Sequence, residues 1–110
     1  MSEQLRNHNE QEFEVPPTPE QVLSVFKELA PEGFKETRRR EDEKGLYLLE
    51  IEAPGKSENE YAEYAYMRKG RYPEGSITAT EIHVTFYEDG MPVSGTTAAK
   101  YENGTWRILK

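Results

Sequence analysis

The chain has 110 residues, a length typical of one globular domain, and its 21 acidic against 14 basic side chains give a formal net charge of −7. This acidity excludes a general affinity for the phosphate backbone of a nucleic acid. The absence of cysteine excludes disulfides, thiolate catalysis and cysteine-ligated metal sites.

The first fifteen residues are polar and rich in glutamate, and they show no hydrophobic period. Such a segment cannot bury enough apolar surface to offset its ordering entropy, so residues 1–15 are predicted to form a flexible acidic tail before a single domain of residues 16–110. The chain has neither the apolar run of a signal peptide nor the roughly 18 consecutive apolar residues of a membrane span. We therefore expect a soluble, cytoplasmic protein with no membrane partner.

A helix is predicted to start at Thr18 or Pro19. Thr18 is a favourable N-cap, Pro19 occupies the first helical position where its missing N–H is tolerated, and Gln21 completes a capping box. The apolar residues that follow have the spacing of one helical face: Val22, Val25, Phe26 and Leu29. Pro31 and Gly33 end the helix, which is too short to be stable alone and must pack on an apolar surface.

Residues 34–40 and 46–53 are predicted to form a hairpin around a polar segment that ends at Gly45. In the second arm, apolar and acidic residues alternate, so that one face is buried and the other is wet. Residues 57–69 are ambiguous. Ser57 and Glu60 match a capping box of a helix, whereas the tyrosines in the segment and its strand-rich surroundings favour a strand, which we predict.

The last third of the chain contains two hairpin signals, Asp89-Gly90 and Asn103-Gly104. Two-residue hairpin turns prefer these dipeptides because both central positions need positive φ. If each strand continues regularly from its turn, the predicted pairs after the first turn are Tyr87 with Pro92, Phe86 with Val93, Val84 with Gly95 and Ile82 with Thr97. After the second turn they are Tyr101 with Trp106 and Ala99 with Ile108.

The two registers agree on which residues share a face of the sheet. The predicted apolar face carries Ile82, Val84, Phe86, Val93, Gly95, Thr97, Ala99, Tyr101, Trp106 and Ile108. The predicted polar face carries Glu81, His83, Thr85, Tyr87, Ser94, Thr96, Lys100, Thr105 and Arg107. A slip of one residue in either hairpin would move its side chains to the other face, so this agreement supports both turns.

These elements predict an α+β single domain, in which one N-terminal α-helix packs on an antiparallel β-meander of about five or six strands. In element order this arrangement resembles the cystatin fold, in which a helix is cupped by a meander. The resemblance covers residues 18–110 and is carried by no family motif, so it implies nothing about function.

Glu81 and His83 are the first candidate site. Two positions apart on one strand, they share a face, and a carboxylate beside an imidazole can form a general base or a metal site. A hydrolytic zinc site needs three protein ligands, and the second histidine, His8, is in the predicted tail. A polar sheet face with a cross-strand pair of His83 and Thr96 is therefore the simpler interpretation.

Arginines and tyrosines supply the other candidate surfaces. Arg38 and Arg40 can share one side of a charged edge strand, where they either discourage aggregation or bind an acidic partner. The tyrosines of the third strand region and its neighbours offer rigid contact area with a polar tip, for packing in the sheet or for recognition. They are Tyr61, Tyr64, Tyr66, Tyr72 and Tyr87.

The leading functional hypothesis is a small non-enzymatic binding or adaptor protein that contacts another protein. The alternative is a small-molecule pocket or a weak acid–base enzyme, with a site between helix and sheet near His83 and Glu81. Gly55-Lys56-Ser57 lacks the earlier glycine of a phosphate-binding loop, and we expect no cofactor.

Overall fold

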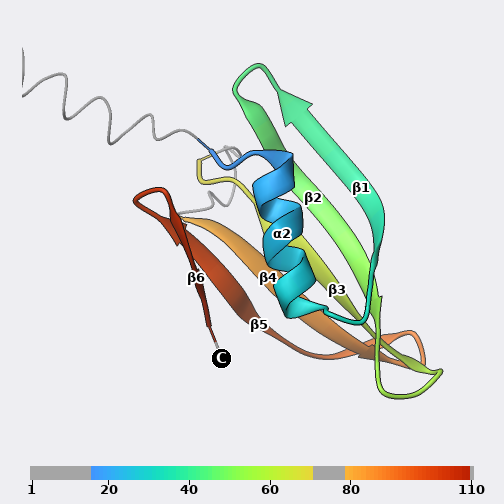
Figure 1. The fold of residues 1–110 in the computed structure, drawn as a ribbon. Coiled ribbons are helices and arrows are strands. Elements are labelled where there is room, and N and C mark those ends of the chain that lie inside the picture. Colours follow the sequence, from blue (N-terminus) through green and yellow to red (C-terminus); the bar gives the residue numbers. More distant parts are fainter. Residues whose placement is uncertain (1–15, 71–78, 110) are drawn as a thin grey trace, which may run out of the picture.

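The computed structural model describes residues 16–70 and 79–109, and Figure 1 shows their arrangement as one helix packed on a sheet. The elements are α2 (Pro19–Leu29), β1 (Lys35–Asp42), β2 (Gly45–Pro54), β3 (Glu60–Met67), β4 (Thr80–Glu88), β5 (Met91–Glu102) and β6 (Thr105–Ile108). The strands pair antiparallel in the order of the sequence, β1-β2-β3-β4-β5-β6. The predicted α+β meander is confirmed.

Helix α2 begins where the sequence predicts. The side chain of Thr18 accepts a hydrogen bond from the backbone N–H of Gln21, and the side chain of Gln21 accepts one from the N–H of Thr18. The helix ends at Leu29, and the N–H of Ala30 donates to the carbonyl oxygen of Phe26. No helix in residues 16–70 or 79–109 is long and apolar enough to cross a membrane.

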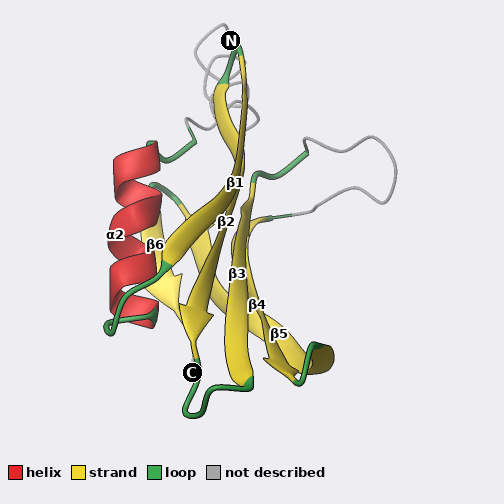
Figure 2. Cartoon of the chain, turned by 90° about the vertical axis from the view of Figure 1, so that its right-hand side faces the viewer, coloured by secondary structure: helices red, strands yellow, loops and turns green. Residues whose placement is uncertain are grey.

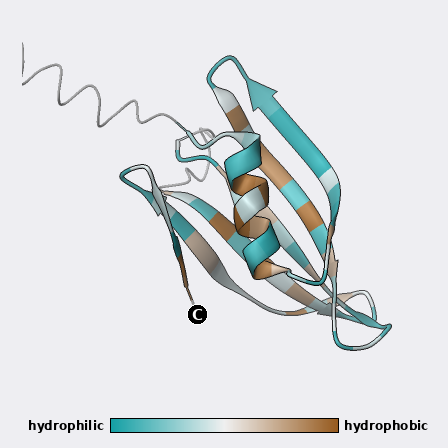
Figure 3. Ribbon diagram, in the orientation of Figure 1, coloured by the Kyte–Doolittle hydropathy of each residue, from teal (hydrophilic) through white to brown (hydrophobic). Residues whose placement is uncertain are grey.

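The core lies between α2 and one face of the sheet. Figure 2 shows the helix on that side of the sheet. Val22, Val25 and Phe26 of the helix are buried against strand residues that alternate along β2, β3 and β4. These strand residues are Leu49, Ile51, Ala53, Ala62, Tyr64, Tyr66, Ile82 and Val84. Apolar residues are visible along the helix and the central strands in Figure 3, whereas β1 is hydrophilic for most of its length.

The ambiguous segment 57–69 contains strand β3, as predicted. Ser57 belongs to a tight turn, in which its carbonyl oxygen accepts a hydrogen bond from the N–H of Glu60 and its hydroxyl donates to Asn59. Strand β3 pairs with β2 on one side and β4 on the other, so its backbone groups find partners across the sheet. The first hairpin also has a shorter loop than predicted, because β1 reaches Asp42 and β2 starts at Gly45.

Both predicted two-residue turns are present, with φ of 54° at Asp89 and Asn103 and 78° at Gly90 and Gly104. The register after the second turn is confirmed by the pairs Tyr101↔Trp106 and Ala99↔Ile108. The register after the first turn is correct for Tyr87↔Pro92 but wrong farther along the strands. The observed pairs are Phe86↔Ser94, Val84↔Thr96, His83↔Thr97 and Ile82↔Ala99.

Two irregularities in β5 explain this correction. The register shifts by one residue between Phe86 and Tyr87 and again between Ile82 and His83, so that Val93 and Ala98 are extra residues in β5. The first bulge moves the residues that follow it in β5 to the opposite face from the one predicted. The second bulge moves the residues after it back to the predicted face. Ala99 and Ile82 therefore share the helix side as predicted, although they were not predicted to pair.

Between the bulges the predicted faces of β5 are wrong. Ser94 and Thr96 pair with Phe86 and Val84 on the helix side, while Gly95 and Thr97 pair with Thr85 and His83 on the other side. We call the side of the sheet turned away from α2 the outer face. In its central part the outer face carries Glu50, Glu52, Tyr61, Glu63, Ala65, Glu81, His83, Thr85 and Tyr87.

Candidate functional site

Glu81 and His83 share the outer face, as the sequence predicts. The Nε2 atom of His83 lies 2.5 Å from Oε1 of Glu81, and Nζ of Lys100 lies 4.0 Å from Oε2 of the same carboxylate. The His83 side chain is 43% exposed. Its strand neighbour across the sheet is Thr97, not the predicted Thr96, because of the bulge at Val93.

The pair does not lie between helix and sheet, where the alternative hypothesis places a pocket. Ile82 and Val84, which alternate with Glu81 and His83 along β4, are the residues buried toward α2. Glu81 and His83 therefore face away from the helix, on the outer face, where the Glu81 side chain is 16% exposed. Among the residues that the structure describes, no group of three or more histidine, aspartate or glutamate side chains could hold a metal ion.

The candidate tyrosines divide between the two faces of the sheet. Tyr61 and Tyr87 are cross-strand neighbours on the outer face, with stacked rings whose centroids lie 4.8 Å apart. Tyr64 and Tyr66 are buried on the helix side, where their hydroxyls donate to the carbonyl oxygens of Leu29 and Leu46, both at 3.4 Å. These two are core residues and offer little exposed surface. Tyr72 lies outside the described residues.

Burial changes the acidity of the two core tyrosines. Desolvation raises the pKa of both Tyr64 and Tyr66 above the ordinary value of 10.0. On the outer face, the pKa of Tyr87 is raised by desolvation and then by the nearby carboxylate of Glu63. None of these phenols is shifted toward neutral pH, so none is activated as an acid or a base there.

The arginines of β1 form a charged edge to the sheet. Arg38 and Arg40 pair with Glu50 and Leu48 and so lie on the outer face together, as predicted, with Nε of Arg38 3.6 Å from Oε1 of Glu50. Arg39 instead donates two hydrogen bonds of 2.9 Å to Glu36, which lower the pKa of that carboxyl. Much of the local basic charge is therefore offset by glutamates of β1 and β2.

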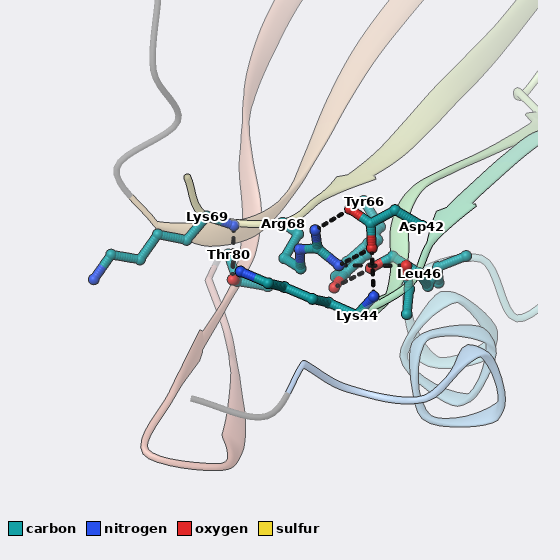
Figure 4. Close-up of polar contacts among 8 residues, drawn as sticks. Asp42, Lys44, Leu46, Tyr66, Arg68, Lys69 and Thr80 are labelled. Atoms are coloured by element: carbon teal, nitrogen blue, oxygen red, sulfur yellow. Dashed lines mark hydrogen bonds and ion pairs between the residues drawn. The ribbon is translucent and has the colours of Figure 1, made fainter. Parts of the chain in front are cut away.

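The sequence analysis missed an ion pair between Arg68 and Asp42, drawn in Figure 4. The guanidinium of Arg68 donates to both carboxylate oxygens of Asp42, at 3.1 and 2.6 Å, and to the carbonyl oxygen of Gly45 at 3.3 Å. Asp42 also accepts a hydrogen bond from the N–H of Lys44. The pair joins the end of β3 to the turn between β1 and β2. It could not be predicted because Asp42 was assigned to a solvated loop.

A pocket of about 460 Å³ lies on the helix side, at the end of the sheet beyond the C-terminus of α2. The apolar part of its lining comes from the helix end and from four strands: Leu29, Ala30, Pro31, Ala53, Ala62, Phe86 and Val93. Of the residues singled out from the sequence, Tyr61, Tyr64 and Tyr87 also line it, whereas Glu81 and His83 do not. We call this cavity the hairpin pocket, because Phe86 and Val93 belong to the two arms of the β4–β5 hairpin.

The exposed large apolar side chains of the described residues gather at this hairpin. They are Phe86, Met91 and Val93, with 42%, 65% and 58% of their surface exposed. Phe86 and Val93 line the hairpin pocket, and Val93 is the extra residue of the first bulge. The sequence contained one signal for this site, since a short helix cannot cover strands of this length.

The comparisons with known proteins identify no relative. The chain matches no protein-family model, no curated protein and no solved structure. The likeness to the cystatin fold therefore remains one of element order, and the function must be argued from the chain itself.

Proposed function

We propose that this protein is a small non-enzymatic binding protein, which contacts a partner protein through the hairpin pocket and the exposed side chains beside it. The observation that carries the proposal is the gathering of Phe86, Met91 and Val93 at one hairpin, next to a pocket with an apolar lining. Exposed apolar side chains are common singly, but several together around a concavity are typical of an interaction site.

The energetics favour this use of the surface. Fully burying an apolar side chain of this size is worth about 1.5–3 kcal/mol, and a partner that covers the exposed part of these three gains a corresponding share from each. Binding energy concentrates in a few such side chains near a well-packed pocket. Phe86 is on β4, which is paired with a strand on each side, so little backbone entropy is lost when a partner contacts the Phe86 side chain. The non-enzymatic part of the proposal is supported by the orientation of Glu81 and His83, which face away from the hairpin pocket.

Peptide selection tests the proposal. A displayed library of random linear peptides is selected on the full-length protein, and the strongest binders are synthesised and mapped by NMR chemical-shift perturbation. We expect the largest shifts at Leu29, Ala62, Phe86 and Val93, and loss of binding in Phe86→Ser.

The control variant is His83→Gln, which alters an exposed side chain of the neighbouring surface on the outer face. It should bind the selected peptides as tightly as the unaltered protein. Selected peptides that shift only outer-face residues away from the pocket, such as Glu81 and His83, would contradict the proposal. Peptide binding that survives Phe86→Ser would contradict it as well.

The volume of the hairpin pocket supports a second candidate, the binding of a small apolar molecule. Ligand pockets usually enclose about 300–1,000 Å³ and have a mostly apolar lining, and this pocket has about 460 Å³. A screen of small aromatic and aliphatic fragments by the same NMR mapping separates the candidates. Fragments that fill the pocket while no peptide binds there would favour the small molecule.

A further inference from the structure

The mouth of the hairpin pocket carries an excess of acidic side chains. Glu32 follows the helix, Glu60 starts β3 and Glu88 ends β4, and all three line the pocket. Lys56 is the one basic residue in the lining. The lining of the pocket therefore combines apolar side chains with more negative than positive charge.

Two of these carboxylates lie in an unfavourable arrangement. Glu60 and Glu88 are directly opposite each other on adjacent antiparallel strands, where like charges destabilise a sheet. They lie on the same side as Ala62 and Phe86, and no salt bridge joins either of them to a described basic side chain. A cation brought to this mouth would relieve their repulsion.

The helix end adds to the negative potential. Leu29 in the last turn of α2 and the C-cap Ala30 line the pocket, and the C-terminal end of a helix carries partial negative charge, of which the Tyr64 hydroxyl offsets a part at the Leu29 carbonyl. Lys27 offsets part of this charge but does not line the pocket. Carboxylates and helix end together favour a positively charged group above an apolar floor.

We propose that the hairpin pocket takes a segment of a partner protein in which a large apolar side chain is flanked by lysine or arginine. The apolar side chain fills the pocket against Phe86 and Val93, and the basic side chain lies between Glu60 and Glu88. The inference rests on the proposed function and adds the chemistry of the partner. A second copy of this chain fits less well, because each copy has a net charge of −7.

The same peptide selection also tests this inference, because it shows which charges lie beside the large apolar side chain of the peptides that bind. Basic residues should be enriched next to it. The strongest binder and its analogue with Lys and Arg replaced by Gln are then titrated calorimetrically at low and high salt. We expect the analogue to bind about tenfold more weakly at low salt, and the difference to shrink as salt screens the rim.

Two triple variants with the same change in net charge provide the matched comparison. The rim variant, Glu32→Gln with Glu60→Gln and Glu88→Gln, should weaken the basic peptide about tenfold and leave the Gln analogue unaffected. The outer-face variant, Glu50→Gln with Glu52→Gln and Glu63→Gln, should leave both peptides unaffected. It includes another opposed pair, Glu52 and Glu63, away from the pocket.

The outcomes separate the two proposals. The inference would be overturned if the peptides that bind in the pocket showed no enrichment of basic residues. It would also be overturned if the rim variant and the outer-face variant weakened peptide binding equally. Either result would leave the proposed function standing. Absence of any peptide binding at the pocket would overturn both. Self-association in sedimentation that Phe86→Ser abolishes would assign the pocket to a second copy and overturn the inference.

Discussion

Tyr66 shows how a single residue joins several parts of the core. Its side chain is fully buried, its hydroxyl donates to the carbonyl oxygen of Leu46 in β2, and its ring meets that of Trp106 in β6 edge-on at 6.1 Å. Tyrosine can take this place because its ring fills the core while its hydroxyl reaches a backbone acceptor. A recognition surface and a core favour the same residue type, so the sequence could not distinguish the two roles.

Tyr66 is expected to make folding sensitive to alkaline pH. Desolvation raises its pKa in the folded protein above the 10.0 of a free tyrosine. Below pH 10 the phenol is protonated in both the folded and the unfolded chain, so its ionisation does not change the free energy of unfolding there. As the pH rises above 10, the unfolded chain loses this proton before the folded chain does, and the free energy of unfolding therefore falls. Tyr66→Phe should lower the free energy of unfolding by about 1 kcal/mol at neutral pH. It should also flatten the alkaline decline measured by denaturant titration.

An equal decline in the unaltered protein and in Tyr66→Phe would show that other groups cause it.

The ion pair of Arg68 and Asp42 should contribute measurably to stability. The Arg68 side chain is only 11% exposed, so removing its partner leaves a mostly buried charge with fewer hydrogen bonds. Asp42→Ala is expected to cost about 1–3 kcal/mol, measured by urea unfolding. Glu36→Ala, which removes the exposed partner of Arg39, should cost less than about 1 kcal/mol. Equal costs would contradict the distinction between the two pairs.

At the scale of elements, residues close in the chain determine where the helix starts and where the hairpins turn. They do not determine the register in which the strands pair. The capping box at Thr18 and the two dipeptides with positive φ were predictable because each depends on neighbouring residues only. The bulges at Val93 and Ala98 were not predictable, since neither residue type marks an extra position in a strand. The confirmed faces of Ile82 and Ala99 depend on two register shifts that cancel.

The N-cap of α2 provides a test at this scale. Thr18→Ala removes the acceptor for the N–H of Gln21 and should lower the free energy of unfolding by about 1 kcal/mol. Ser24→Ala changes an exposed residue within the same helix and should be neutral or slightly stabilising, because alanine has the higher helix propensity. Chemical unfolding followed by circular dichroism compares them. A neutral Thr18→Ala would show that the cap is dispensable.

At the scale of the whole molecule, the hairpin pocket results from a mismatch in length. A helix of 11 residues covers about 16 Å, whereas a strand of 12 residues spans about 40 Å. The helix end at Leu29 therefore leaves the hairpin end of the sheet without cover, and the apolar side chains there remain exposed.

The stability lost on replacing Phe26 and Phe86 should differ, because only Phe26 lies within the core. Phe26→Ala removes a fully buried ring beneath the helix and is expected to cost about 3–5 kcal/mol. Phe86→Ala removes a ring that is 42% exposed and should cost about 1 kcal/mol. Thermal and denaturant unfolding of both variants measures the difference. A large loss in Phe86→Ala would mean that the hairpin end belongs to the core and does not serve binding.

The sequence by itself determined the helix, the two tight turns, the α+β meander and the shared face of Glu81 and His83. Each of these follows from contacts between residues close in the chain, or from strict alternation along one strand. The tertiary structure decided which tyrosines are buried, where the sheet bulges, how Arg68 finds Asp42, and that a pocket lies beside Phe86. These depend on the pairing of distant strands and on the relative lengths of helix and sheet, which no local pattern records.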